Sequence, residues 1–335
     1  MIILVTGATG HIGNVLVREL VKQGRQVRAL LLPGESQHPL NDLDVEIVEG
    51  DVLDPASLVK ACKGVDLVFH LAGMISICPG KDRQVWRVNV EGTRNIIHAV
   101  IENGCARLVY TSSIHALRRV DGDEVMDEGI AFDPHNSVGV YDRSKAAASL
   151  AVLEAVRQGL NAVLVCPTGV VGPFDYRVSE MGNLILSWIN SKFHFLINGS
   201  FDFVDVRDVA RGHILAAEKG KSGETYILSG EQISLIRMNE IVRQTTGKKA
   251  MMLPVPIPLA HFAALFTPIY YRMTQKIPQF TRYSIVTVTG NSRYSHAKSS
   301  QELGYTPRPL TEAIVDTVTW WMQNKKYVYS TKHLK

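Results

Sequence analysis

Short apolar runs alternate with helical patterns through the first half of the chain. Runs typical of buried strands lie at residues 1–6, 27–32, 45–48, 65–72, 107–112 and 162–166. Apolar residues recur with helical spacing between them, at residues 12–21, 84–102 and 141–158. Strands separated by helices favour right-handed βαβ units. We therefore predict an α/β fold, a Rossmann-type doubly wound parallel sheet.

The pattern becomes irregular after Pro173, with turns, aromatic residues and prolines. This change predicts a second, smaller lobe. We place a dinucleotide-binding Rossmann domain at residues 1–173 plus about 201–224, and a C-terminal substrate-binding lobe at about 174–200 and 225–325. Residues 326–335 are mostly polar and are expected to form a loosely ordered tail.

One long apolar segment lies in the second half of the chain. Residues 253–271 are apolar for most of their length, but Pro254, Pro256, Pro258 and Pro268 interrupt them. A membrane-spanning helix needs ~20 predominantly apolar residues, so we expect no transmembrane span. We expect a helix that covers the pocket, with a peripheral membrane contact as the alternative.

Composition and charge exclude several classes of protein. The 335 residues are 46% hydrophobic and carry a formal net charge of +4, which is typical of a globular protein. Basic residues occur in runs no longer than a pair, so no nucleic-acid partner is expected. The four cysteines have no C-x-x-C spacing, and the apolar N-terminus lacks the positive region and small-residue cleavage site typical of a signal peptide. We expect reduced thiols, no metal and a cytoplasmic location.

A glycine-rich segment, TGATGHIG, lies between the first strand and the first helix. Glycines there permit a tight turn and close approach of the backbone to a pyrophosphate. The helix that follows offers free N–H groups to the phosphates. The segment predicts a dinucleotide site formed by Thr6, Gly7, Ala8, Thr9, Gly10, His11, Ile12 and Gly13.

The end of the second strand bears on the choice of nicotinamide cofactor. An acidic residue there would accept hydrogen bonds from the ribose 2′-hydroxyl, and an arginine would pair with a 2′-phosphate. The strand ends in Leu30, Leu31, Leu32 and Pro33, which offer neither group. Because no carboxylate repels a 2′-phosphate, NADP(H) is slightly favoured over NAD(H).

Tyr141 and Lys145 lie four residues apart, on one face of a predicted helix. The pKa of tyrosine is normally near ~10, and a neighbouring ammonium lowers it toward the working range of an acid–base catalyst. Ser113 ends the strand before this helix, beside the expected cofactor crevice. Together these residues predict a site for oxidation and reduction.

The motifs in this order resemble those of an extended short-chain dehydrogenase/reductase, most closely the branch of dihydroflavonol reductases and 3β-hydroxysteroid dehydrogenases. They are TGATGHIG at 6–13, GDV at 50–52, HLAG at 70–73, VNVEGT at 88–93, TSS at 111–113, YDRSK at 141–145, PTGVVGP at 167–173, FVDVRDVA at 203–210 and ELGYTP at 302–307. The resemblance implies that Tyr141 exchanges the proton, that Ser113 binds the substrate oxygen and that Lys145 also holds the nicotinamide ribose. It adds these cofactor-binding residues: Asp51, Val52, Leu71, Ala72, Gly73, Thr111, Pro167, Thr168, Gly169 and Val170.

The same resemblance leaves nucleotide-sugar epimerases and dehydratases as the alternative, because they share the fold and the catalytic residues. Such enzymes commonly place arginines on the substrate diphosphate, where this chain has Phe201 and residues 284–288, which lack arginine. Dehydratases usually carry an Asp-Glu pair where Ser112 and Ser113 stand. These departures favour a carbonyl–alcohol oxidoreductase. A redox sensor without catalysis is less favoured, because such a sensor would lose the Tyr–Lys pair.

The candidate substrate wall is mostly apolar, which suits an apolar carbonyl or alcohol substrate. Its expected members are Met74, Ile75, Ile77, His115, Phe174, Tyr176, Met181, Phe201 and Phe203, with residues 255–283. The resemblance also implies a homodimer formed through the helices at 84–102 and 141–158.

Overall fold

Seven parallel strands form the central sheet of the computed structural model, in the order β10-β6-β5-β4-β1-β2-β3. The structure describes residues 1–75, 80–120, 122–267, 273 and 281–324. The strands are β1 (Ile2–Thr6), β2 (Gln26–Leu31), β3 (Glu46–Glu49), β4 (Leu67–His70), β5 (Arg107–Thr111), β6 (Ala162–Pro167) and β10 (Thr225–Leu228). The order reverses between β1 and β4, and a ligand-binding crevice is expected at such a point. The predicted Rossmann-type sheet is confirmed.

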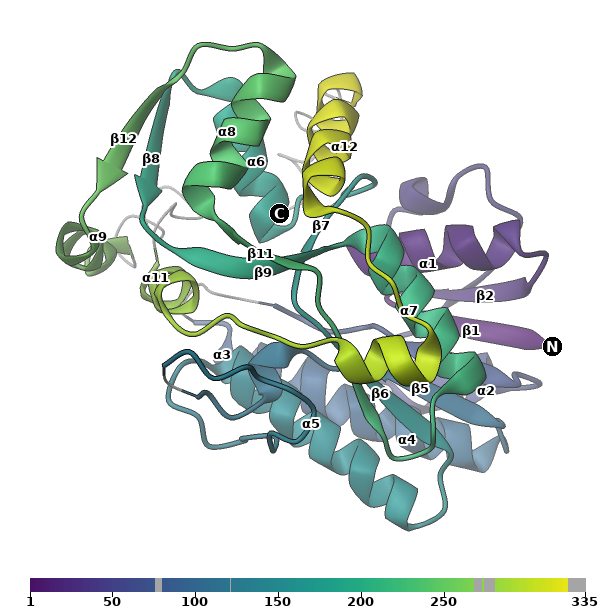
Figure 1. Ribbon diagram of the computed structural model, residues 1–335. Helices are drawn as coiled ribbons and strands as arrows, with labels where there is room; N and C mark the ends of the chain where they lie inside the picture. Colours follow the sequence, from purple (N-terminus) through teal and green to yellow (C-terminus); the bar gives the residue numbers. More distant parts are fainter. Residues whose placement is uncertain (76–79, 121, 268–272, 274–280, 325–335) are drawn as a thin grey trace.

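Helices cover both faces of this sheet (Figure 1). On one face lie α1 (His11–Lys22) and α7 (Val206–Lys219), which pack on side chains such as Val5 and Phe69. On the other lie α2 (Pro55–Cys62), α4 (Gly92–Glu102) and α5 (Val140–Arg157), which pack on Leu4 and Val68. Successive side chains of a strand point to opposite faces, so strands buried on both sides read as unbroken apolar runs. A short helix, α3 (Asp82–Trp86), and a π-helical turn (Arg87–Glu91) precede α4.

The second lobe stands beyond the carboxyl ends of the central strands (Figure 1). It contains a three-stranded sheet and a separate pair of parallel strands. The strands are β7 (Gly169–Val171), β9 (Ser200–Asp205) and β11 (Glu231–Ser234) in the sheet, with β8 (Phe193–Ile197) and β12 (Met251–Val255) in the pair. The helices are α6 (Glu180–Asn190), α8 (Leu235–Thr246), α9 (Ile257–Ala264), α11 (Arg282–Thr289) and α12 (Leu310–Gln323).

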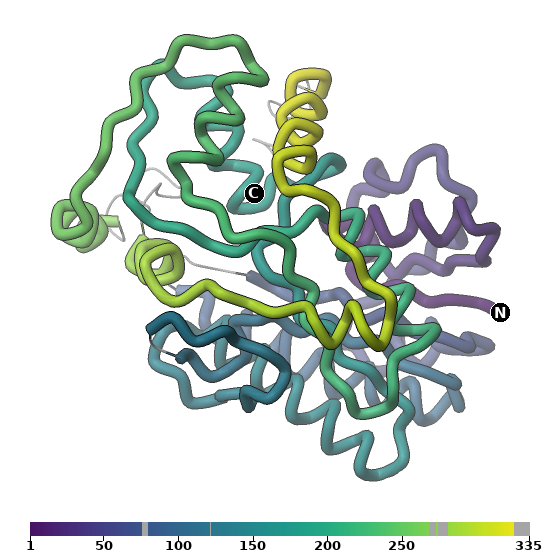
Figure 2. Tube along the Cα trace, in the orientation of Figure 1, coloured from purple at the N-terminus to yellow at the C-terminus, as the bar shows by residue number. Residues whose placement is uncertain are grey.

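The division between the lobes differs from the one predicted. Residues 225–228 were assigned by pattern to the substrate-binding lobe, but they form β10 and pair with β6 in the central sheet. A later π-helical turn (Ser299–Leu303) also joins the first lobe, where Leu303 and Tyr305 are buried in its core. Figure 2 shows the yellow-green segment after α11 running back along the first lobe before α12. The first lobe is therefore completed by residues far along the chain.

Part of the apolar segment at residues 253–271 forms β12 and α9, and its residues 268–271 lie outside the described residues. α9 packs against α11 on the side of the substrate-binding lobe. The expected pocket-covering role belongs instead to α11, whose side chains line the described cavity. Among the described residues, no helix combines the length and the apolar run that crossing a membrane requires.

Candidate active site

The glycine-rich loop between β1 and α1 leaves room for a ligand that approaches the backbone closely. Gly7 adopts a positive φ of 67°, and a Cβ there would lie 2.7 Å from the backbone nitrogen of Ala72. A Cβ on Gly13 would lie 2.0 Å from the carbonyl oxygen of Gly7. The Gly10 N–H donates to that same oxygen at 3.0 Å, which closes the turn. This cradle fits a dinucleotide pyrophosphate, because larger side chains would distort the loop or fill the space.

Asn14, which lies outside the predicted motif, joins this loop to the second lobe. Its Nδ2 donates to the carbonyl oxygens of Gly10 at 2.7 Å and Phe174 at 3.1 Å. The side chain lies one residue beyond the glycine motif and is fully buried. In the sequence, Asn14 can be recognised as a polar residue on an otherwise apolar helix face, where a buried amide needs hydrogen-bond partners.

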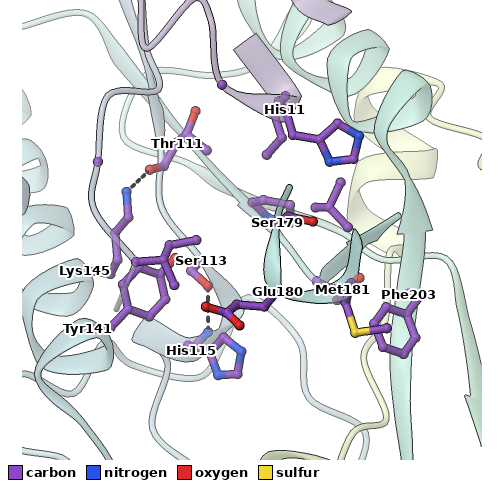
Figure 3. A pocket seen from close by; sticks show the side chains of 18 of the residues that line it. His11, Thr111, Ser113, His115, Tyr141, Lys145, Ser179, Glu180, Met181 and Phe203 are labelled. Atoms are coloured by element: carbon purple, nitrogen blue, oxygen red, sulfur yellow. Dashed lines mark hydrogen bonds between the residues drawn. The ribbon is translucent and has the colours of Figure 1, made fainter. Parts of the chain in front are cut away.

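A cavity of about 550 Å³ opens between the glycine-rich loop and the second lobe. Its first-lobe wall follows the carboxyl ends of β1, β4, β5 and β6, and its other wall comes from α6, α11 and β9. In Figure 3, Lys145, Tyr141 and Ser113 extend from one side of the pocket, and Ser179 and Met181 of the α6 region from the other. The following predicted cofactor residues line it: Gly7, Gly10, His11, Ile12, Gly13, Leu71, Gly73, Thr111, Tyr141, Lys145, Pro167, Thr168, Gly169 and Val170.

Six predicted cofactor residues are absent from the described lining: Thr6, Ala8, Thr9, Asp51, Val52 and Ala72. Thr6 is fully buried, and its Oγ1 accepts from the Ala72 N–H at 3.1 Å and contacts His70 Nδ1 at 2.7 Å. Burial lowers the pKa of His70 to about 3, so that ring is neutral. Thr6 therefore supports the loop from behind. A direct role for Asp51 and Val52 at the adenine stays a prediction.

Ser113, Tyr141 and Lys145 are brought together by β5 and α5. Ser113 follows β5, and its Oγ accepts from the His115 N–H at 3.2 Å in a short 3-10 turn (Ile114–Ala116). Tyr141 and Lys145 share one face near the start of α5, where both side chains are buried. The Lys145 ammonium donates to the carbonyl oxygen of Thr111 at 2.7 Å (Figure 3). The three side chains therefore converge at one end of the cavity.

Burial dominates the acid–base properties of this group. It raises the pKa of Tyr141 to about 12, although a hydrogen bond with Ser113 opposes the shift. It lowers the pKa of Lys145 to about 8. The pKa of Tyr141 therefore lies above its ordinary value and not below it as expected, because burial of the phenolate is the largest contribution.

The profile of the NAD-dependent epimerase/dehydratase family matches residues 3–229, which cover the glycine-rich loop, Ser113, Tyr141 and Lys145. The chain belongs to this family. It is accordingly an extended short-chain dehydrogenase/reductase, as the motifs predict, and an enzyme of the NAD-dependent oxidoreductase and epimerase class.

Some proteins similar in sequence to this chain are named as reductases or dehydrogenases. A protein called sterol demethylase protein B, from Methylococcus capsulatus, is 34% identical, covering 96% of this chain and 99% of the relative. A putative dihydroflavonol 4-reductase from Synechocystis sp. is also 34% identical, covering 97% and 95%. A 3-beta-hydroxysteroid dehydrogenase from Mycolicibacterium neoaurum is 27% identical, covering 92% and 88%.

Two solved structures share the fold of this chain. The crystal structure of gox2253 has a TM-score of 0.83 and 34% identity, covering 96% of this chain and 98% of that one. DesIV, a dTDP-glucose 4,6-dehydratase from Streptomyces venezuelae solved with NAD bound, has a TM-score of 0.79 and 21% identity, covering 98% of each chain. At that identity the likeness to DesIV shows the fold alone.

The structure brings some of the expected substrate-wall residues to the cavity and places others away from it. The cavity is lined by five of the expected residues: Ile75, His115, Met181, Phe201 and Phe203. Three others, Met74, Phe174 and Tyr176, are absent from the lining. Ile77 lies outside the described residues. The Tyr176 ring packs edge-on against Trp320 at 5.2 Å between ring centroids. Phe174 packs against the same indole at 6.3 Å. Both aromatic rings thus join the core of the second lobe.

A buried carboxylate next to Tyr141 is a feature that the sequence patterns did not single out. Asp142 is fully buried, and its Oδ1 accepts from the Tyr283 hydroxyl at 2.7 Å. Its Oδ2 contacts Arg119 Nη2 at 3.4 Å. The ring of His115 lies 5.8 Å from that of Tyr283 and stacks on Phe201 at 5.7 Å. The pair formed by Asp142 and Tyr283 therefore anchors α11, and with it one wall of the cavity, to the start of α5.

Glu35 is another residue that the sequence patterns did not single out, and its carboxylate lies beside the glycine-rich loop. Its carboxylate accepts hydrogen bonds from the Leu32 N–H at 2.8 Å and from the Thr9 hydroxyl. Arg177, which lines the cavity from the second lobe, forms an ion pair with the same carboxylate. Glu35 lies in the loop after β2, and the chain turns back there so that its carboxylate reaches the end of β2 and the glycine-rich loop.

Proposed function

We propose that this enzyme transfers hydride between a nicotinamide cofactor and the carbonyl or alcohol group of a largely apolar small molecule. The observation that carries the proposal is the meeting of Ser113, Tyr141 and Lys145 with an apolar wall that includes Met181 and Phe201. The names of the reductase and dehydrogenase relatives support this reaction class.

Each side chain has a defined task in this reaction. The nicotinamide, when bound, supplies or takes up the hydride. Ser113 Oγ donates a hydrogen bond to the substrate oxygen and holds it beside the Tyr141 hydroxyl. In reduction Tyr141 gives its proton to that oxygen, and in oxidation it removes the proton from the alcohol. The Lys145 ammonium stabilises negative charge on Tyr141 and binds the nicotinamide ribose, while the glycine-rich loop holds the pyrophosphate.

The cavity wall favours this substrate class over a nucleotide sugar. Phe201, Ser284 and Thr287 line it at the positions where diphosphate-binding arginines were sought. Among the described residues that line the cavity, the arginine is Arg177. Its guanidinium already forms an ion pair with the Glu35 carboxylate. A diphosphate needs charge-assisted donors, so binding one here would require breaking that ion pair.

A substrate screen tests the reaction class directly. Oxidation of NADH and NADPH is followed at fixed enzyme concentration with ketones, aldehydes, flavonoids and steroids, and separately with nucleotide sugars. We expect turnover with apolar carbonyl compounds and none with nucleotide sugars. Conversion of a nucleotide sugar without net cofactor consumption would instead establish the epimerase or dehydratase alternative.

The position of Glu35 reverses the slight preference for NADP(H) inferred from the end of β2. We propose that the enzyme prefers NAD(H), because Glu35 places a fixed carboxylate beside Thr9 of the cofactor loop. A carboxylate at this side of a Rossmann fold accepts hydrogen bonds from the ribose hydroxyls and repels a 2′-phosphate. The bond from the Leu32 N–H holds the carboxylate in place.

Replacing Glu35 by alanine should weaken NADH binding and relieve the repulsion of NADPH. We expect the ratio of the two dissociation constants to shift toward NADPH by about tenfold or more, since like-charge contacts cost several kcal/mol. Fluorescence titration of the two reduced cofactors measures this without any substrate. The control is Glu49→Ala, which removes an exposed carboxylate at the end of β3 and should leave the ratio unchanged. An unchanged ratio in the Glu35 variant would refute the assignment.

Pairing of two chains through the exposed sides of α4 and α5 remains a further proposal. Both helices present an apolar side chain outward, Ile101 and Leu150 respectively.

A further inference from the structure

Helix α9 buries small side chains against the protein and exposes large apolar ones, which is the reverse of a typical surface helix. The side chains buried against the protein are Ala260 and Ala264. Phe262 is 59% exposed, and Leu265, just after the helix, is 69% exposed. A helix on the surface of a globular protein normally buries its large apolar residues and exposes polar ones. The outer side of α9 therefore presents large apolar side chains that an apolar environment would bury.

The strand pair that leads into α9 also exposes large apolar side chains. Phe193 and Phe195 alternate outward along β8, and Met251 on β12 is the register partner of Phe193. Since alternate residues of a strand share one side of the sheet, these three side chains lie together on the outer side of the pair. Figure 1 shows β8, β12 and α9 along one edge of the second lobe. We call this surface, formed by Phe193, Phe195, Met251, Leu259, Phe262, Leu265 and Phe266, the α9 face.

Positive charge accompanies the α9 face. Exposed Lys192 directly precedes β8, and exposed Lys248 and Lys249 stand before Ala250 and β12. The Met251 N–H donates to the carbonyl oxygen of Lys192 at 2.9 Å. The lysines therefore gather where the two strands begin. The sequence contains no aspartate or glutamate from residue 191 to 199, or from residue 241 to 301. The whole chain has a formal net charge of only +4, so this segregation of charge is local.

We propose that the α9 face docks on an anionic lipid bilayer. Exposed phenylalanine and leucine side chains enter the boundary between headgroups and acyl chains, while nearby lysines contact anionic headgroups. A second copy of the chain fits less well, because a two-fold contact would bring like lysine clusters together without acidic partners on the face. The docking does not depend on the reaction proposed above.

The α9 face is also connected to the cavity. α9 packs against α11, and Tyr283, Ser284, Thr287 and Val288 of α11 form part of the cavity wall. The docked enzyme would therefore hold its substrate-binding lobe at the bilayer, where apolar substrates accumulate.

Vesicle sedimentation of the full chain tests the docking. The probes are extruded phosphatidylcholine vesicles, either pure or with phosphatidylglycerol as about a third of the lipid. We expect sedimentation with the anionic vesicles, weakening strongly between about 0.1 M and about 0.5 M salt because the charges are screened. Phe262→Ser with Leu265→Ser should reduce the partition coefficient about tenfold or more. Lys192→Glu with Lys249→Glu should have an effect of similar size.

Matched controls separate docking from unfolding and from general charge effects. Val125→Ser with Met322→Ser removes exposed apolar residues elsewhere, and Lys22→Glu with Lys60→Glu reverses exposed charges elsewhere. Both should bind vesicles like the wild type, and all variants should keep the thermal unfolding midpoint and cofactor affinity. Absence of binding to anionic vesicles, or equal losses in the controls, would overturn the proposal. So would a dimer in light scattering that the Phe262 and Leu265 variant abolishes, since a second copy would then cover the face.

Discussion

Replacing Tyr141 by phenylalanine is expected to lower kcat by about three orders of magnitude, because the variant lacks the hydroxyl that we propose exchanges the proton. The hydroxyl lies in a buried site where Ser113 hydrogen-bonds it and where water is a poor substitute. The phenylalanine ring keeps the packing of the start of α5. Cofactor affinity should therefore remain nearly unchanged.

The measurement for this variant combines steady-state kinetics on the best carbonyl substrate from the screen with fluorescence titration of the reduced cofactor. Tyr176→Phe is the matched control, because that ring packs against Trp320 and is absent from the described cavity lining. The control should keep the activity of the wild type. Full activity in the Tyr141 variant would exclude Tyr141 as the proton donor and acceptor.

Replacing Lys145 by methionine is expected to reduce both turnover and cofactor affinity. The ammonium is buried and donates to the Thr111 carbonyl oxygen, and the Thr111 hydroxyl is in turn bonded to His213 Nε2 at 2.8 Å. Methionine fills similar space without a charge, so Tyr141 loses the cation that would stabilise its phenolate. We expect a loss of about a hundredfold or more in kcat, together with a higher dissociation constant for the cofactor.

The pH dependence of cofactor binding isolates the charge of Lys145. Burial lowers its pKa to about 8, so the ammonium is present below that pH and is lost as the pH rises through it. Cofactor affinity of the wild type should therefore fall above about pH 8, and this fall should be absent in Lys145→Met. The exposed lysine Lys60→Met serves as control and should titrate like the wild type. An identical pH profile in the Lys145 variant would show that this charge plays no part in binding.

The fold and the chemical centre of this protein follow from local sequence features. Apolar runs separated by helical spacing predict the parallel sheet, because strands covered on both faces must be apolar throughout. The glycine-rich loop is predictable because its close backbone contacts exclude a Cβ at Gly7 and Gly13. Tyr141 and Lys145 meet because the helical repeat places residues four apart on one face.

The details that shape specificity arise from contacts between distant parts of the chain. Arg177 meets Glu35 across the lobes, and Tyr283 reaches Asp142 from α11. Neither pair has a signal in local spacing. Phe174 and Tyr176 follow a motif of the first lobe, yet they pack on Trp320 near the end of the chain.

Burial and strand pairing were likewise decided only by the three-dimensional arrangement. The short apolar pattern of β10 would also suit a strand of the second lobe. Its pairing with β6 depends on the path of the chain back to the central sheet after α7. The pKa of Tyr141 depends on how completely both lobes exclude water from it. Local patterns specify which backbone forms and which neighbours lie within a turn of helix, whereas desolvation and long-range pairing are properties of the packed whole.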